Sequence, residues 1–314
     1  MDEAPVIDVR GLTKRFGGRT VVDAVDLSVA RGRICGFLGP NGSGKTTTLR
    51  MICGLLIPDA GEGTVFGFDM RRQRSAIKAR VGYMTQKFGL FSDLTIAENL
   101  EFFARVHGLD RRGERVDEAL ERLGLSSRSG QLAGSLSGGW KQRLALAACV
   151  LHEPEILLLD EPTAGVDPQA RREFWEQIHD LATRGMTVLV STHYMDEAER
   201  CHEIAYIAYG RMLARGTIDE VVSASHLHAL QGEGRLEDGR GADRLAAEIE
   251  QRPGVAMAAP FGAAIHVCGP DAQALRDAVA PWADRIAWRE TKPSLEDVFI
   301  HLMRGAEDRS VAVR

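Results

Sequence analysis

The stretch from Gly39 to Thr46 carries the glycine spacing, the lysine and the hydroxyl of a phosphate-binding loop. Glycines let a backbone curl around a phosphate and aim its amides inward, and a following helix adds partial positive charge. The Lys45 ammonium would reach the β- and γ-phosphates, and the Thr46 hydroxyl would coordinate Mg²⁺. The predicted phosphate-binding residues are Gly39, Pro40, Asn41, Gly42, Ser43, Gly44, Lys45, Thr46 and Thr47. They predict a nucleoside triphosphate site.

Two carboxylates follow an unbroken apolar run, residues 156–159. Such a run is typical of a strand that is buried on both faces of a parallel sheet. Asp160, at the end of that strand, could hold the Mg²⁺ that Thr46 holds from the other side. Glu161 is then placed to orient or deprotonate the attacking water. Together the two residues predict hydrolysis of the bound nucleotide.

Two further polar residues follow predicted strands, at the carboxyl ends where α/β proteins hold ligands. Gln86 follows residues 81–84, and its amide could contact Mg²⁺ or the attacking water. His193 follows residues 187–190 and could reach the γ-phosphate. A lone histidine is often structural, but the position after a buried strand favours a site residue. We therefore expect both side chains beside the phosphates.

Two other features have more than one interpretation. Ser137, Gly138 and Gly139 open a predicted helix that Ser137 would cap, and this is either a common turn or a second anion site. Phe16 precedes the turn Gly17–Gly18 and could be a core aromatic or a platform for a nucleobase. From the residues alone, both interpretations of each feature stay open.

Strands and helices alternate around these residues. Residues 34–38 and 46–53 are expected to form the strand and the helix on either side of the phosphate loop. Alternation of apolar and polar residues predicts antiparallel strands at 6–9 and 25–29, and another short strand ends at 65–66. Helices are expected at 95–107 and 114–123. Residues 90–150 therefore interrupt the alternation as an inserted helical subdomain.

Composition narrows the functional classes. The chain has 314 residues and a net charge of −5, which argues against general nucleic-acid binding. The longest apolar run, residues 144–151, is far shorter than a membrane span, and we expect no N-terminal signal segment. The five cysteines are spread widely without a C-x-x-C pair, which predicts reduced thiols in a cytosolic protein.

Taken in order, these motifs resemble the ATP-binding subunit of an ABC transporter over residues 5–220. The matching segments are Walker A at 39–46, the Q-loop residue Gln86, the signature at 136–139, Walker B at 156–160 with Glu161, the D-loop residue Asp167 and the switch residue His193. The resemblance implies ATP and Mg²⁺ as ligands and places Phe16 at the adenine. It also implies two facing copies, with Ser137 and Gly139 of one copy completing the γ-phosphate site of the other. One departure is Trp140, where the signature usually has glutamine.

The resemblance also implies the fold. We expect an α/β P-loop NTPase core of RecA-like type with an antiparallel β edge, over residues 5–220, and a small α+β domain over 222–314. Residues 227–288 predict the element order βαββαβ, the ferredoxin-like arrangement. Ser294 and Asp297 have capping-box spacing, and an apolar stripe follows in that helix, which could dock on its own domain or pair two copies.

Segments near residues 140–143, 192–198 and 293–299 look closest to the ABC-2 group, which includes drug-resistance exporters. We therefore expect an ATPase on the inner face of the cell membrane that powers a separate permease. Phe88, Leu90 and Phe91 could contact that permease or pack under the helical subdomain. An importer ATPase stays an alternative. ATPases of translation or DNA repair fit less well, because they need a second Walker A motif or a long heptad insertion.

Overall fold

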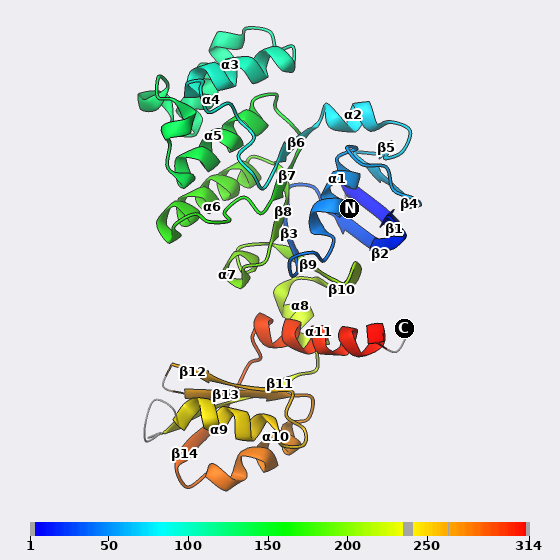
Figure 1. Cartoon of the computed structure of the whole chain (residues 1–314), viewed down its shortest axis with the longest axis vertical. Coiled ribbons are helices and arrows are strands. Elements are labelled where there is room, and N and C mark those ends of the chain that lie inside the picture. Colours follow the sequence, from blue (N-terminus) through cyan, green and yellow to red (C-terminus); the bar gives the residue numbers. More distant parts are fainter. Residues whose placement is uncertain (1–3, 235–240, 263, 312–314) are drawn as a thin grey trace. The chain divides into compact units, whose positions relative to one another are not determined.

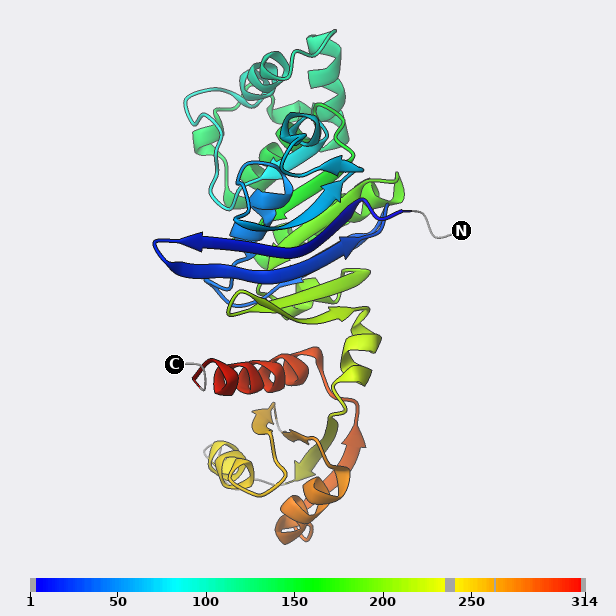
Figure 2. The ribbon, with the colours of Figure 1, turned by 90° about the vertical axis from the view of Figure 1, so that its right-hand side faces the viewer.

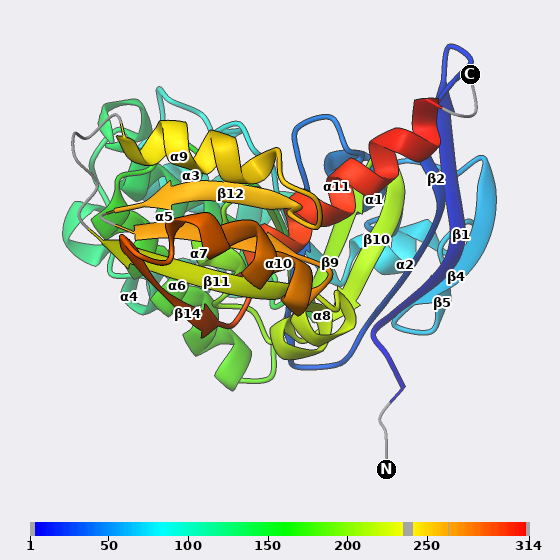
Figure 3. The same ribbon diagram turned by 90° about the horizontal axis from the view of Figure 1, so that it is seen from below.

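The computed structural model describes residues 4–234, 241–262 and 264–311. The chain divides into two compact units, Met1–Arg215 and Gly216–Arg314, and each unit is shown in Figures 1 to 3. Within those described ranges, no helix combines the length and the apolar character needed to cross a bilayer.

A six-stranded sheet organises the first unit, with the strand order β10-β9-β3-β8-β7-β6. Neighbouring strands from β9 to β6 are parallel, so their carboxyl ends lie along the same edge. The phosphate loop follows β3 at this edge, and Gln86, Asp160 and His193 lie at or just after the ends of β6, β7 and β8. The strands are β3 (Ile34–Leu38), β6 (Val81–Met84), β7 (Ile156–Asp160), β8 (Thr187–Thr192), β9 (Glu203–Ala208) and β10 (Arg211–Gly216).

Strand β7 shows why this sheet needs unbroken apolar strands. All of its residues are buried. Leu157 and Leu159 pack into the core on the side of α5 (Gly138–Val150) and α6 (Pro168–Thr183). Ile156 and Leu158 pack into the core on the opposite side, with α1 (Lys45–Ile52). Figure 1 shows these helices on the two sides of the sheet. The prediction of a strand buried on both faces is confirmed.

An antiparallel sheet, β2-β1-β4-β5, forms the edge of this unit. The hairpin of β1 (Ile7–Phe16) and β2 (Arg19–Val29) pairs Ile7 with Val29 and Phe16 with Arg19, and Figure 2 shows its two long strands side by side. Strand β1 is longer than expected, because residues 12–16 pair with β2 before the turn at Gly17–Gly18. The sheet is completed by β4 (Ala60–Val65) and β5 (Phe68–Asp69), with α2 (Arg74–Lys78) after them.

Helices fill the region that interrupts the parallel strands, as predicted. Helix α3 (Ile96–Val106) begins at a capping box in which Thr95 Oγ1 accepts from the Glu98 amide. It is followed by α4 (Arg112–Arg122), two short 3₁₀ turns at Ser126–Arg128 and Ala133–Ser135, and then α5. Leu100, Leu120 and Leu144 from α3, α4 and α5 share one apolar core. That core continues onto α6 and the sheet.

The second unit begins with α8 (Ile218–Ala224) and has a four-stranded antiparallel sheet with the order β12-β13-β11-β14. Ile265 and Val267 face the core shared with α9 and α10, which cover one face of the sheet (Figure 3). His266 points to the other face, where it contacts α11. The remaining elements are β11 (His228–Gly234), α9 (Gly241–Glu250), β12 (Met257–Phe261), β13 (Ala264–Gly269), α10 (Ala272–Val279), a 3₁₀ turn at Ala280–Trp282, β14 (Ile286–Thr291) and α11 (Leu295–Val311).

The structure tests two predictions for α11, its capping box and its apolar stripe. The Ser294 amide donates to Asp297 Oδ2 at 2.7 Å and the Asp297 amide donates to Ser294 Oγ at 3.1 Å, so the capping box is confirmed. Leu295, Val298 and Phe299 are buried within the chain, which favours docking over pairing of two copies. The elements that were not predicted from the sequence are α2, α6, α7 (Met195–Ala198), α8, β5, β9 and β10.

Candidate functional site

The phosphate loop connects β3 to α1 through backbone that only glycine tolerates. A Cβ atom on Gly39 would lie 2.0 Å from the Ile207 carbonyl oxygen, and one on Gly44 would lie 2.8 Å from the Val21 carbonyl oxygen. Gly44, with a φ of 105°, is also the N-cap of α1. These glycines therefore let the loop pack closely against β2 and β9, and its backbone amides stay available to bind a ligand.

A phosphate fits the residues of this loop. Ser43 Oγ is buried without a hydrogen-bond partner among the described residues. A bound phosphate would supply the missing partner. Lys45 is 4% exposed and its ammonium donates to the carbonyl oxygens of Gly39 at 2.7 Å and Pro40 at 3.1 Å. The cation is thus held at the loop mouth by two backbone carbonyls and by the nearby Glu161 carboxylate, and a phosphate oxygen can replace the neutral carbonyl acceptors.

Asp160 lies at the centre of a hydrogen-bond network at the end of β7. Thr46 Oγ1 donates to Asp160 Oδ1 at 3.0 Å and Ser191 Oγ donates to the same oxygen at 2.8 Å. Tyr83 donates to Asp160 Oδ2 at 3.3 Å. A threonine hydroxyl beside a carboxylate is the hard oxygen pair that suits Mg²⁺, which keeps waters and phosphates as its other ligands. The described residues contain no group of three or more His, Cys, Asp or Glu side chains placed to hold a metal ion.

Glu161 faces the phosphate loop from the next position. Its carboxylate lies 3.3 Å from the Lys45 ammonium, accepts from the Gln86 amide at 3.0 Å and lies 3.6 Å from His193 Nδ1. The backbone of Glu161 has a φ of 48°, and its amide donates to Ser191 Oγ at 3.0 Å. A left-handed conformation in a non-glycine residue costs on the order of 1–3 kcal/mol, and such strain is concentrated at functional sites.

The structure therefore places the residues from the phosphate loop, Gln86, Asp160, Glu161 and His193 together at one edge. His193 is one-third exposed, and its Nδ1 is a buried atom without a hydrogen-bond partner in the described part of the chain. Gln86 donates to Glu161, whereas Thr46 donates to Asp160. In this arrangement Gln86 is nearer to the expected base than to the expected metal ligands.

Two contributors to this site were missed in the sequence. Ser191 bridges Asp160 and the Glu161 amide, and Tyr83 donates to Asp160 from β6. Both lie in apolar strands, Tyr83 shortly before Gln86 and Ser191 shortly before His193. Their side chains could be assigned only once the strand order placed β6 and β8 on either side of β7.

The signature residues do not join the phosphate loop of the same chain. Ser137 is the N-cap of α5 but makes no side-chain capping bond, so its hydroxyl stays available, and Ser137 and Gly138 are exposed. A Cβ atom on Gly139 would lie 2.5 Å from the Ala170 side chain, at the start of α6. Asp167 caps that same helix by accepting from the amides of Gln169 and Ala170.

Phe16 is not a core residue. Its side chain is 49% exposed at the end of β1, and the Lys14 ammonium lies 5.5 Å from the centre of its ring. Of the two interpretations left open by the sequence, the core aromatic is therefore wrong. Phe16 is not buried because it lies at the tip of the hairpin, beyond the part of β1 and β2 that packs against the core.

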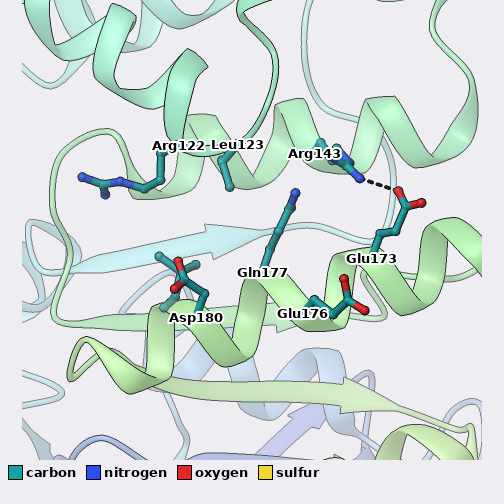
Figure 4. A pocket seen from close by; sticks show the side chains of 8 residues that line it. Arg122, Leu123, Arg143, Glu173, Glu176, Gln177 and Asp180 are labelled. Atoms are coloured by element: carbon teal, nitrogen blue, oxygen red, sulfur yellow. Dashed lines mark hydrogen bonds and ion pairs between the residues drawn. The ribbon is translucent and has the colours of Figure 1, made fainter.

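Trp140 packs between two arginines, with the guanidinium carbons of Arg128 and Arg143 at 4.5 and 4.8 Å from its ring centre. Arg143 also pairs with Glu173 of α6, at one side of a cavity of about 310 Å³ (Figure 4). The departure from glutamine thus replaces a polar side chain with an aromatic one that connects α5 to its neighbours.

A second cavity, of about 390 Å³, lies beside β6. We call it the β6 groove. Phe88 and Leu90 line it and pack partly against the core, whereas Phe91 is 43% exposed and packs edge-on against Phe102. The groove is lined by Leu55, Val81, Tyr83, Met84, Thr85, Lys87, Phe88, Gly89, Leu90, Phe103, His107, Gln142, Ala145, Ala148, Cys149 and His152.

Residues 22–164 match the family model described as ABC transporter. The chain is 39% identical to the daunorubicin resistance ATP-binding protein DrrA3 of Streptomyces coeruleorubidus, over 97% of each chain. It is 46% identical to the probable multidrug ABC transporter ATP-binding protein YbhF of Escherichia coli, over 70% of this chain and 38% of YbhF. The chain thus spans well under half the length of YbhF.

Solved structures agree with this match. One is cbiO1 from Clostridium perfringens, described as part of the ABC transporter complex cbiONQ, with a TM-score of 0.65 and 28% identity. The similarity covers 70% of this chain and 92% of cbiO1. The fold is that of an ABC-type P-loop ATPase.

Proposed function

The chain belongs to the ABC transporter family of ATP-binding proteins, and we propose that it hydrolyses ATP to power a separate membrane permease. The observation that carries the proposal is the position of Glu161 at the mouth of the phosphate loop, in contact with Lys45, Gln86 and His193. A carboxylate held there can take a proton from water that attacks the terminal phosphate.

Each residue of the site then has a role. Lys45 and the loop amides bind the β- and γ-phosphates, and Gln86 and His193 orient the water and the γ-phosphate. Thr46 and Asp160 would hold Mg²⁺, which neutralises charge on the phosphates when bound. Phe16, exposed at the tip of the hairpin of β1 and β2, stacks on the adenine.

Two copies of the chain form the working unit. The support is that Ser137, Gly138 and Asp167 are exposed and that none of the hydrogen bonds described for this chain joins Ser137 to the phosphate loop. A free Ser137 hydroxyl and the Gly139 amide at a helix N-terminus suit a phosphate supplied by another copy. ATP would therefore lie between Walker A of one copy and the signature of the other.

The transported compound is a drug or another small hydrophobic molecule, moved outward. The support is similarity over nearly the full chain to a daunorubicin resistance protein, together with the exporter-like segment 293–299. The permease would dock at the β6 groove, whose apolar walls include Phe88 and Leu90. This places the chain at the inner face of the membrane. The second unit, with the ferredoxin-like order βαββαβ, acts as an accessory domain.

Replacing Glu161 by Gln tests the paired site. The variant keeps Mg²⁺ and ATP binding but loses the base, so ATP accumulates between two copies and holds them together. Light scattering should give a monomer without nucleotide and a dimer with Mg-ATP. A Ser137→Ala change in the same background should weaken that dimer. A monomer under both conditions contradicts the paired site.

A further inference from the structure

Tyr83 belongs both to the β6 groove and to the hydrogen-bond network of Asp160. Its side chain lines the β6 groove, and its hydroxyl donates to Asp160 Oδ2 at 3.3 Å. On the other side of the hydroxyl is Arg50 of α1, whose pKa rises because it hydrogen-bonds Tyr83. The phenol is therefore held between a carboxylate and a guanidinium.

The two oxygens of Asp160 are fixed by different groups. Oδ1 accepts from Thr46 and Ser191, and Oδ2 accepts from Tyr83. An ionised carboxylate offers only acceptor atoms, so the phenol supplies the proton of this hydrogen bond. Asp160 is 2% exposed, and water cannot readily replace a lost donor there.

We propose that Tyr83 is a positioning residue that holds the Asp160 carboxylate for its metal ion and transmits the state of the β6 groove to it. The proposal rests on the proposed function, because it assigns a role within the ATP site. Tyr83 is one of the residues that line the groove, and its hydroxyl contacts Asp160, so one residue connects the groove to the carboxylate. A small shift of the ring changes the length of a hydrogen bond that is already long.

A purely structural role makes a different prediction. Phenylalanine would fill the same space and pack against the same core, so a packing role requires only the ring. A positioning role requires the hydroxyl. The change Tyr83→Phe therefore separates the two roles.

The first experiment measures Mn²⁺ binding to the full-length protein by electron paramagnetic resonance, at saturating non-hydrolysable ATP analogue. We expect Tyr83→Phe to weaken Mn²⁺ binding about three- to tenfold, because the carboxylate loses one hydrogen bond. Binding of the analogue in EDTA and the melting temperature should stay close to wild type. Tyr83→Leu, which removes the ring as well as the hydroxyl, should weaken Mn²⁺ binding at least as much and should also lower the melting temperature.

The second experiment fills the groove from inside. Ala145 of α5 lines it, so Ala145→Phe places a ring where a partner side chain would lie. We expect this change to alter Mn²⁺ affinity when Tyr83 is present and to have no further effect in the Tyr83→Phe background. Such non-additivity is the signature of two coupled residues.

Three results would overturn the inference. Unchanged Mn²⁺ affinity in both Tyr83 variants rules out positioning of Asp160. An Ala145→Phe effect that is absent, or equal in both backgrounds, rules out transmission from the groove. Failure of the wild-type protein to bind the ATP analogue removes the proposed function itself and the inference with it. The first two results leave the ATP site intact, so the two failures are distinguishable.

Discussion

At the scale of single residues, the site is organised around two adjacent carboxylates with different surroundings. Asp160 accepts hydrogen bonds from hydroxyl groups, as an oxygen ligand of a hard cation would. Glu161 faces an ammonium, an amide and an imidazole, as a base near a phosphate would. One peptide bond thus separates the carboxylate proposed to bind the metal from the carboxylate proposed to accept the proton.

Replacing Lys45 by Ala should weaken ATP binding about 10- to 100-fold, because a buried cation makes charge-assisted bonds to the phosphates. Isothermal titration with ATP measures this. Lys78→Ala, at the exposed end of α2, is the control and should bind like wild type. Wild-type affinity in Lys45→Ala would refute the phosphate-loop assignment.

Residue types alone identified the polar side chains at the strand ends, because charged and amide groups after apolar runs are conspicuous. They did not identify Ser191 or Tyr83, whose contacts to Asp160 depend on which strands are neighbours. They also suggested a capping bond for Ser137 that is absent, since a serine at an N-cap position need not turn its hydroxyl inward.

At the scale of elements, most strands and helices around the site could be predicted from periodicity and position. The buried strands β3, β7 and β8 are short apolar runs. The phosphate loop follows β3, β7 ends at Asp160, and His193 follows β8. Helix α6 was missed although Asp167 and Pro168 form a strong start signal, an N-cap followed by proline. Strands β9 and β10 were missed because no conspicuous polar residue follows them.

The β6 groove belongs to this scale, because it is built from β6, its loop and helices α3 and α5. Replacing both Phe88 and Phe91 by Ala should keep basal ATP hydrolysis and lose the membrane partner. Activity and co-purification from detergent-solubilised membranes are measured together. Leu132→Ala removes an exposed apolar side chain elsewhere and is the control.

Two outcomes would count against this assignment. A complex that survives the double substitution places the docking surface elsewhere. Unfolding of the protein would assign these side chains to the core. The partial packing of Phe88 fits that alternative, whereas the exposure of Phe91 argues against it.

The start of α11 allows a test of stability. Asp297 is 1% exposed; its burial opposes ionisation, but hydrogen bonds from His266 and Ser294 lower the pKa of Asp297 overall. A lowered pKa in the folded state stabilises the protein above the unfolded value of about 3.9, and this contribution is lost as pH falls through the folded pKa. Asp297→Ala should therefore destabilise the second unit by about 1–3 kcal/mol at pH 7.

Urea unfolding at pH 7 and at successively lower pH values measures this contribution. The difference between wild type and Asp297→Ala should shrink only on the acid side, while Asp271→Ala, at an exposed cap of α10 that accepts from a backbone amide, should cost less. A constant difference down to the lowest pH at which the protein stays folded would contradict the role of the ionised carboxylate.

At the scale of the whole molecule, the division between Arg215 and Gly216 separates every predicted phosphate-contacting residue from the second unit. A chain that ends at Arg215 should therefore bind ATP as the full chain does, with altered pairing of copies or altered coupling to a permease. Fluorescence titration with a labelled ATP analogue checks the binding. A folded truncation that cannot bind ATP would show that the second unit completes the site.

The central claim is that this chain hydrolyses ATP with Glu161 as its base, and phosphate release by the purified full-length protein tests it most directly. Wild type should turn over Mg-ATP, whereas Glu161→Gln should reduce kcat by about 10²–10⁴-fold with ATP affinity unchanged. Phosphate release by Glu161→Gln at the wild-type rate, from protein free of contaminating ATPase, would contradict the account.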